Sequence, residues 1–160
     1  MKMSFIAATR LPILVVDDEK NYRIILSRIL TGAGYQVLTA DGLQAAMRLL
    51  REQPVALILS DMHMPGIGGL ELCRLVSRDI GSIPFILFSA FISAHSRQQI
   101  DATVDSWGSL SKPFDNQDVL SLVKTVLTAS TSCPQLTHEQ NHDKTASKKF
   151  HIYTDEQENI

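Results

Sequence analysis

The fold of this chain is decided by the stretch VALILSDMHMPG at residues 55–66. Its apolar run reaches Asp61 without the polar alternation of a half-exposed strand, so it predicts a strand covered on both faces, as in the centre of a parallel sheet. Pro65 and Gly66 then break regular structure. Asp61 should therefore lie where a strand meets a loop, which is where open α/β sheets bind their ligands. A single acid at this place could also be a turn residue or a helix cap.

A second apolar segment, LPILVV at residues 11–16, also ends in acids, which are Asp17, Asp18 and Glu19. We interpret it as another buried parallel strand. The apolar residues that follow recur at helical spacing and stop at two glycines; they are Tyr22, Ile25, Leu26, Ile29 and Leu30, followed by Gly32 and Gly34. This part of the chain is therefore predicted to be a strand and then an amphipathic helix.

The same alternation continues along the chain, with further strands predicted at residues 36–39, 84–89 and 109–111. Asp41 and Asp115 stand where each could cap the helix that follows. Three further helices are predicted from their apolar faces: Leu43, Ala46, Met47 and Leu50; Leu70, Cys73, Leu75 and Val76; and Val119, Leu122, Val123, Val126 and Leu127. A weaker helix with few apolar residues is predicted at about residues 96–104. Five strands that alternate with five helices predict a three-layer α/β domain with a mainly parallel sheet.

Composition limits the kind of protein. The chain has 160 residues, which fits one domain, and we expect an N-terminal extension at 1–10, a folded domain at 11–129 and a polar, flexible tail at 130–160. Lysine and arginine number 15 against 17 acids, for a net charge of −2, which disfavours nucleic-acid binding. The tail is too short and too polar for an appended DNA-binding or ATPase domain.

The cysteines and the hydropathy pattern point to a cytoplasmic protein. Cys73 and Cys133 are far apart and match no metal-ligand spacing, so we expect a reducing compartment and no disulfide. The apolar start of the chain is too short for a signal peptide, and no apolar run is long enough to span a membrane. The tail histidines, His138, His142 and His151, also match no zinc pattern.

Side chains that could bind a ligand or take part in a reaction stand at the ends of four predicted strands. They are Asp17 and Asp18, Asp61, Ser89 and Lys112. Because parallel strands end at one edge of the sheet, we expect these side chains to converge. Three carboxylates in one pocket repel one another unless their pKa values rise or a cation neutralises them, and oxygen ligands of this kind suit Mg²⁺. Asp61 could then attack a phosphoryl group and become an aspartyl phosphate, with Lys112 offsetting the charge. Taken one by one, the same residues could be a solvated helix start, a strand-end hydroxyl and a surface lysine.

Residues 11–128 resemble the receiver domain of two-component response regulators. The matching motifs are ILVVDDE at 13–19, LSDMHMPG at 59–66, FSA at 88–90 and SKPF at 111–114. The resemblance implies a flavodoxin-like, five-stranded parallel sheet with five helices. The strand order 2-1-3-4-5 is the order of flavodoxin-like folds, and it follows from the resemblance alone.

The resemblance also implies roles for single residues. Asp61 would be the phosphoacceptor, and Asp17, Asp18, Asp61 and the main-chain carbonyl of His63 would bind Mg²⁺. A sensor histidine kinase would supply the phosphoryl group. Ser89 would be the switch hydroxyl, and Lys112 the lysine that contacts the phosphoryl group.

The sequence departs from the family pattern in the switch region. An aromatic residue often stands three positions before the Lys-Pro pair, whereas this chain has Ser109 there, and Trp107 is a candidate replacement. The segment from Ser89 to Lys112 is also one residue longer than usual. His63 and Phe91 flank the expected path of the hydrolytic water, and because both are bulky we expect slow self-dephosphorylation. His63 could instead position the water.

We expect a signalling receiver that catalyses only its own phosphorylation and dephosphorylation and acts through a protein contact. Phosphorylation could also promote a homodimer. An alternative is that the chain is the receiver part of a larger transcription regulator that has been truncated. A small aspartyl-phosphate phosphohydrolase of the haloacid dehalogenase kind needs a second aspartate where His63 stands. A nucleotide-binding module is disfavoured because GIGG at 66–69 lacks the last glycine of the dinucleotide fingerprint, so these glycines are better explained by a turn and a helix start.

Overall fold

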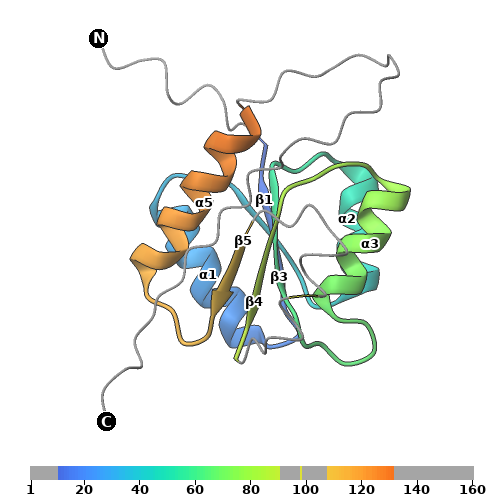
Figure 1. Cartoon of the computed structure of the whole chain (residues 1–160), viewed down its shortest axis with the longest axis horizontal. Helices are drawn as coiled ribbons and strands as arrows, with labels where there is room; N and C mark the ends of the chain where they lie inside the picture. The colour runs from blue at the N-terminus through green and yellow to red at the C-terminus, as the bar shows by residue number, and fades with distance from the viewer. Residues whose placement is uncertain (1–10, 91–97, 99–107, 132–160) are drawn as a thin grey trace.

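The computed structural model describes residues 11–90, 98 and 108–131. Within these ranges strands and helices alternate (Figure 1). The elements are β1 (Ile13–Val16), α1 (Lys20–Gly32), β2 (Val37–Ala40), α2 (Leu43–Glu52), β3 (Leu57–Asp61), α3 (Gly69–Asp79), β4 (Phe85–Ser89), β5 (Gly108–Ser111) and α5 (Asn116–Thr131). All five predicted strands are present, and each differs from its predicted bounds by only one or two residues at an end.

The strands form one sheet of order β2-β1-β3-β4-β5, and every neighbouring pair is parallel. The predicted fold class and strand order are therefore confirmed. The register pairs Val16 with Ser60, Asp61 with Phe88, and Ser89 with Ser111. The carboxyl ends of these strands consequently meet at one edge of the sheet.

Two hydrophobic layers cover the sheet, and successive strand residues belong to different layers. Ile13 and Val15 pack with the inner faces of α1 and α5, whereas Leu14 and Val16 pack with those of α2 and α3. Figure 1 shows α1 and α5 on one side of the sheet and α2 and α3 on the other. Because both faces are buried, strands β1, β3 and β4 need apolar residues at successive positions, which explains the unbroken runs in the sequence.

The helix predictions were less accurate in detail. Asp41 does not cap α2, because Gly42 is the N-cap residue and no side chain bonds there. In α1, Leu26 is buried as predicted, but Ile25 is 46% exposed. Neighbouring helical residues point about 100° apart, so a stripe centred on Leu26 turns Ile25 toward solvent. In α3, Leu72 is fully buried although the sequence pattern selected Leu75, which is half-buried.

Other predictions about helices hold or lie outside the described residues. The cap of α5 is confirmed, because Asp115 Oδ1 accepts a hydrogen bond of 2.8 Å from the Asp118 N–H. Asp118 Oδ2 accepts a reciprocal bond of 3.3 Å from the Asp115 N–H. The predicted helix at 96–104 and the tail beyond Thr131 fall outside the described residues, so the structure describes four helices. None of the described helices is long and apolar enough to cross a membrane.

Candidate functional site

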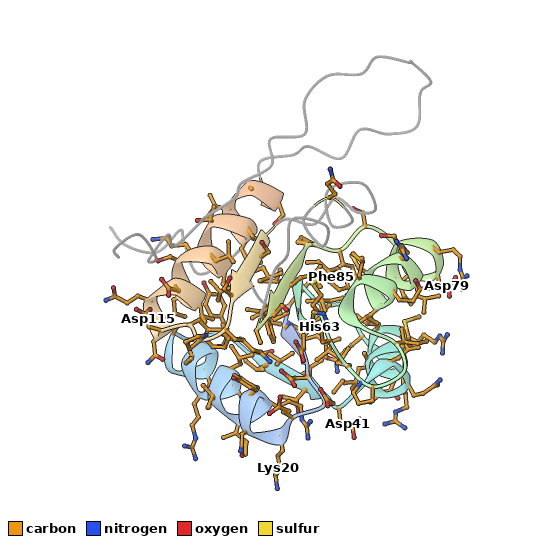
Figure 2. The ribbon with its side chains drawn as sticks, turned by 60° about the horizontal axis from the view of Figure 1, so that its bottom comes forward. Lys20, Asp41, His63, Asp79, Phe85 and Asp115 are labelled. Carbon is orange, nitrogen blue, oxygen red and sulfur yellow. The ribbon has the colours of Figure 1, made fainter. Side chains whose placement is uncertain are left out.

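Three carboxylates gather at the edge where the strands end. Asp17 and Asp18 follow β1, and Asp61 is the last residue of β3. Each offers a carboxylate oxygen, and the three oxygens lie within 4.8 Å of one another. Asp17 is fully buried and Asp61 is 5% exposed, whereas Asp18 is exposed. Figure 2 turns this edge toward the viewer, with His63 near the middle and Lys20, Asp41 and Asp115 nearer the periphery.

The turn after β1 fixes the position of Asp17. Its main-chain N–H donates to the Ala40 carbonyl at 3.1 Å, and its Oδ1 accepts a bond of 2.8 Å from the Glu19 N–H. Arg23 Nη1 donates to the main-chain carbonyls of Asp17 at 2.7 Å and Asp18 at 3.1 Å. The Arg23 guanidinium therefore stabilises the turn by binding main-chain oxygens of the turn rather than the carboxylates of Asp17 and Asp18.

The pocket is electrostatically strained without a second cation. Burial raises the pKa of Asp17 above its ordinary value of 3.8, and the nearby Asp61 charge adds to that rise. The Glu19 N–H and the Lys112 ammonium act in the opposite direction on the same pKa and do not fully offset burial. A site of this kind gains stability from any cation that the carboxylates can share.

Lys112 reaches the carboxylates from the end of β5. Its Nζ lies 3.3 Å from Asp17 Oδ2 and 3.6 Å from Asp61 Oδ1, and its side chain is only 8% exposed. Its main-chain N–H donates to the Ser89 carbonyl at 2.7 Å, which ties the end of β5 to the end of β4. The peptide bond from Lys112 to Pro113 is cis.

Ser89 and His63 meet beside Asp61. Ser89 is 1% exposed, and its Oγ lies at hydrogen-bond distance, 3.1 Å, from His63 Nδ1. The His63 N–H points at Asp61 Oδ1 at 3.5 Å. The structure thus brings together Asp17, Asp18, Asp61, Ser89 and Lys112, whose convergence the sequence predicted, and it places the His63 side chain beside Ser89.

The remaining predicted residues are placed elsewhere or lie outside the described part. Ser109 is half-buried in β5 and pairs with Leu87, two residues back from the edge where Ser89 pairs with Ser111. Phe91 and Trp107 lie outside the described residues. Sequence analysis missed Arg23, and it assigned Tyr22 only to the helix core. A basic residue six positions after the first acid was the available signal for Arg23.

Two glycines let α3 begin close to Asp61. A Cβ on Gly69 would meet the main-chain oxygen of Asp61 and would lie 2.8 Å from Ser60 Oγ. A Cβ on Gly68 would meet the main-chain oxygen of Met62. Gly66 has a φ of +83°, which side chains rarely adopt. The interpretation of these glycines as turn and helix-start residues is confirmed.

A doubly wound parallel sheet with an acidic pocket and a lysine at its carboxyl edge defines a class of small α/β domains that bind ligands at that edge. The chain belongs within that class to the response regulator receiver domain family, whose model matches residues 13–124.

Known proteins agree with this assignment. The response regulator MprA of Mycobacterium leprae is 36% identical over 117 residues, which are 72% of this chain and 50% of that protein. A protein of Arabidopsis thaliana named as two-component response regulator ARR21 is 27% identical over 136 residues, 83% of this chain and 22% of that protein. The chain therefore spans half or less of the length of these relatives.

Solved structures agree on the fold. The chemotaxis protein CheY4 of Vibrio cholerae superposes with a TM-score of 0.69 at 28% identity, over 72% of this chain and 98% of that one. The signal receiver domain of an HD domain-containing protein from Pseudomonas fluorescens gives a TM-score of 0.72 at 26% identity, over 77% of this chain and 99% of that one. The chain is thus a receiver domain of the two-component response regulators.

Proposed function

We propose that Asp61 is the phosphoacceptor of this receiver and that a sensor histidine kinase is its phosphodonor. The observation that carries the proposal is the placement of Asp61 beside two further carboxylates and within 3.6 Å of the Lys112 ammonium. A carboxylate oxygen of Asp61 would form a bond to phosphorus while the phosphorus–nitrogen bond of the donor breaks. The bonding electrons would stay with the leaving imidazole, which then takes up a proton.

The donor set of the pocket fits Mg²⁺. Carboxylate oxygens are the ligands that this ion prefers, and Asp17, Asp18 and Asp61 would hold it together with the main-chain carbonyl of His63. Bound there, the ion would neutralise the carboxylates and withdraw charge from phosphoryl oxygens. The raised pKa of the buried Asp17 supports this proposal, because burial disfavours the charged form of that carboxyl and a bound cation would offset this cost.

The protein side chains have separate tasks in the transfer. Lys112 would offset the charge that develops on the phosphoryl oxygens, as a positioned cation does in phosphoryl transfer. Ser89 would donate its hydroxyl hydrogen to a phosphoryl oxygen. His63 borders the reacting carboxylate, and its bulk would hinder the approach of water.

The output would be a contact with another protein. A phosphoryl group can act only by biasing a surface between two states that a partner distinguishes. The chain would modify itself and no separate substrate, it would act in the cytoplasm beside its kinase, and phosphorylation could promote a homodimer. Because the relatives are about twice as long or longer, the same receiver could instead serve a larger regulator.

Labelling with a small phosphodonor tests the assignment. The parent, Asp61→Asn and Asp41→Asn are treated with acetyl phosphate and Mg²⁺, and their intact masses are measured. Asp41 is the matched control, because it is an exposed acid at the same edge and caps no helix. We expect one phosphoryl group on the parent and on Asp41→Asn, and none without Mg²⁺. Labelling of Asp61→Asn at the parental rate would show that Asp61 is not the acceptor.

A further inference from the structure

The ammonium of Lys112 has an aromatic neighbour that the family motifs do not include. Lys112 Nζ lies 3.7 Å from the centroid of the Tyr22 ring. Tyr22 is half-buried in the first turn of α1, and Lys112 lies at the far end of the sheet order, after β5. The contact therefore joins segments that are distant in the sequence.

The geometry fits a cation–π interaction. A cation within about 6 Å of an aromatic centroid is attracted to the face of the ring, most strongly where water is excluded. The Lys112 side chain is 8% exposed, and its two carboxylate neighbours lie at 3.3 Å and 3.6 Å. The ring is thus a third attractive neighbour of an ammonium that can donate three hydrogen bonds.

The Tyr22 ring is itself held in place by other aromatic side chains. Its centroid lies 6.1 Å from that of Phe114, and the Phe114 ring packs against Phe88 at 6.0 Å with an interplanar angle of 67°. Phe88 also faces Lys112, at 5.4 Å from Nζ. Such tilted and edge-to-face contacts are favourable arrangements for aromatic pairs. The cluster of Tyr22, Phe88 and Phe114 therefore links α1, β4 and the segment after β5 around one lysine.

We propose that Tyr22 is a positioning residue for phosphoryl transfer: the face of its ring holds the Lys112 ammonium against Asp17 and Asp61. Lysine has a long flexible stem, so a lysine that is already in place avoids the entropy cost of ordering that stem when the phosphoryl group arrives. The proposal rests on the proposed function of Asp61. It gives helix α1 a role in positioning Lys112, in addition to the role of the turn before α1, which supplies Asp17 and Asp18.

The first experiment compares Tyr22→Phe, which keeps the ring, with Tyr22→Leu, which keeps apolar volume without an aromatic face. Protons held over a ring face resonate upfield, so the Lys112 Cε protons report the contact by NMR in the unphosphorylated protein. We expect the parental shift in Tyr22→Phe and its loss in Tyr22→Leu. The initial rate with acetyl phosphate and Mg²⁺ should stay near the parental value in Tyr22→Phe and fall by about three- to tenfold in Tyr22→Leu.

A second series keeps the test decisive even if Tyr22→Leu does not fold. Phenylalanines with one, two and three ring fluorines at position 22 weaken the attraction for a cation with little change of shape. We expect the phosphorylation rate to fall stepwise with each fluorine. A flat series, or a Tyr22→Phe variant as slow as Tyr22→Leu, overturns the proposal. Absence of labelling in the parent refutes the proposed function instead, while the Lys112 shift of the parent still decides whether the ring holds the lysine.

Discussion

Removal of the positive charge of Lys112 should destabilise the metal-free protein. Lys112→Met is the appropriate change, because methionine keeps an unbranched apolar stem against Tyr22 and Phe88. At the observed 3.3 Å and 3.6 Å, the attraction of the ammonium for each carboxylate is about 5 kcal/mol at an effective dielectric constant of about 20. Desolvation of the three groups cancels part of this attraction. Loss of one partner from a buried ion pair costs about 3–5 kcal/mol, so we expect about 3 kcal/mol at neutral pH.

Urea unfolding with and without Mg²⁺ measures this cost. An unfolding free energy of about 5–15 kcal/mol is usual, so a loss of 3 kcal/mol is a large fraction of the total. Mg²⁺ at a hundred times its dissociation constant for the parent would add about 2.7 kcal/mol to the unfolding free energy of the parent. At the same Mg²⁺ concentration, the unfolding free energy of Lys112→Met should rise by more, because no ammonium competes for the carboxylates. The difference in unfolding free energy between Lys112→Met and the parent should therefore narrow.

The exposed Lys124 on α5 provides the control. Lys124→Met should change the unfolding free energy by no more than about 0.5 kcal/mol. The electrostatic argument is wrong if Lys112→Met and the parent unfold at the same urea concentration without Mg²⁺. It is also wrong if Mg²⁺ leaves the gap between them unchanged.

Three further predictions concern the pocket and its surroundings. Because burial raises the pKa of Asp17, the folded state holds its proton more tightly than the unfolded state, and stability contributed by this group falls as pH rises above its ordinary value of 3.8. Metal-free Asp17→Asn should therefore lose less stability than the parent in urea titrations between about pH 4 and pH 7. Gly69→Ala should lower the unfolding free energy by about 1–3 kcal/mol in thermal melts, because the new methyl group meets the Asp61 carbonyl. His63→Asn should shorten the lifetime of the acyl phosphate, measured by the decay of labelled protein. The smaller side chain admits water and loses the contact of the His63 ring with the Ser89 hydroxyl.

Each of these predictions has an outcome that would contradict it, and Gly69→Ala also has a control variant. Gly32→Ala should be neutral or slightly stabilising, because a Cβ there meets nothing within 4 Å. An equal loss in both alanine variants would contradict the steric argument for Gly69. Parallel pH profiles of Asp17→Asn and the parent would contradict the burial argument. Decay of His63→Asn at or below the parental rate would refute shielding by His63 and favour a role in positioning water.

The sheet and the pocket could be predicted because each leaves a local signal. Strands that are buried on both faces need continuous apolar runs, and β1 and β3 show them directly. An acid at the end of such a run must lie at the carboxyl edge, so Asp17 and Asp61 could be brought together without coordinates. Lys112 followed by the same argument, because it comes directly after the brief strand predicted at residues 109–111.

The details of α1 could not be predicted, because they depend on what packs against the helix. Helical spacing placed both Ile25 and Leu26 in the core, and only the position of the sheet decides which of these neighbours is buried. Tyr22 fitted the same apolar pattern, while its ring face lies against Lys112. A contact across such a separation in sequence leaves no periodic trace. Asp41 failed as a cap for a related reason, since the local pattern allows two neighbouring residues to start the helix.

The contact between Ser89 and His63 decides what the hydroxyl must give up in the proposed function. If His63 Nδ1 carries the proton, Ser89 Oγ accepts, and the hydroxyl hydrogen is not committed to His63. With the other tautomer Ser89 donates to Nδ1, and the 3.1 Å bond must break before a phosphoryl oxygen can be bound. A neutral hydrogen bond contributes about 0.5–1.5 kcal/mol, whereas a bond to a charged oxygen contributes about 1.5–3 kcal/mol. With this second tautomer the phosphoryl group is the stronger partner, so its arrival would draw Ser89 away from His63. Because the Ser89 carbonyl also holds the Lys112 N–H, that movement would reach both β4 and β5.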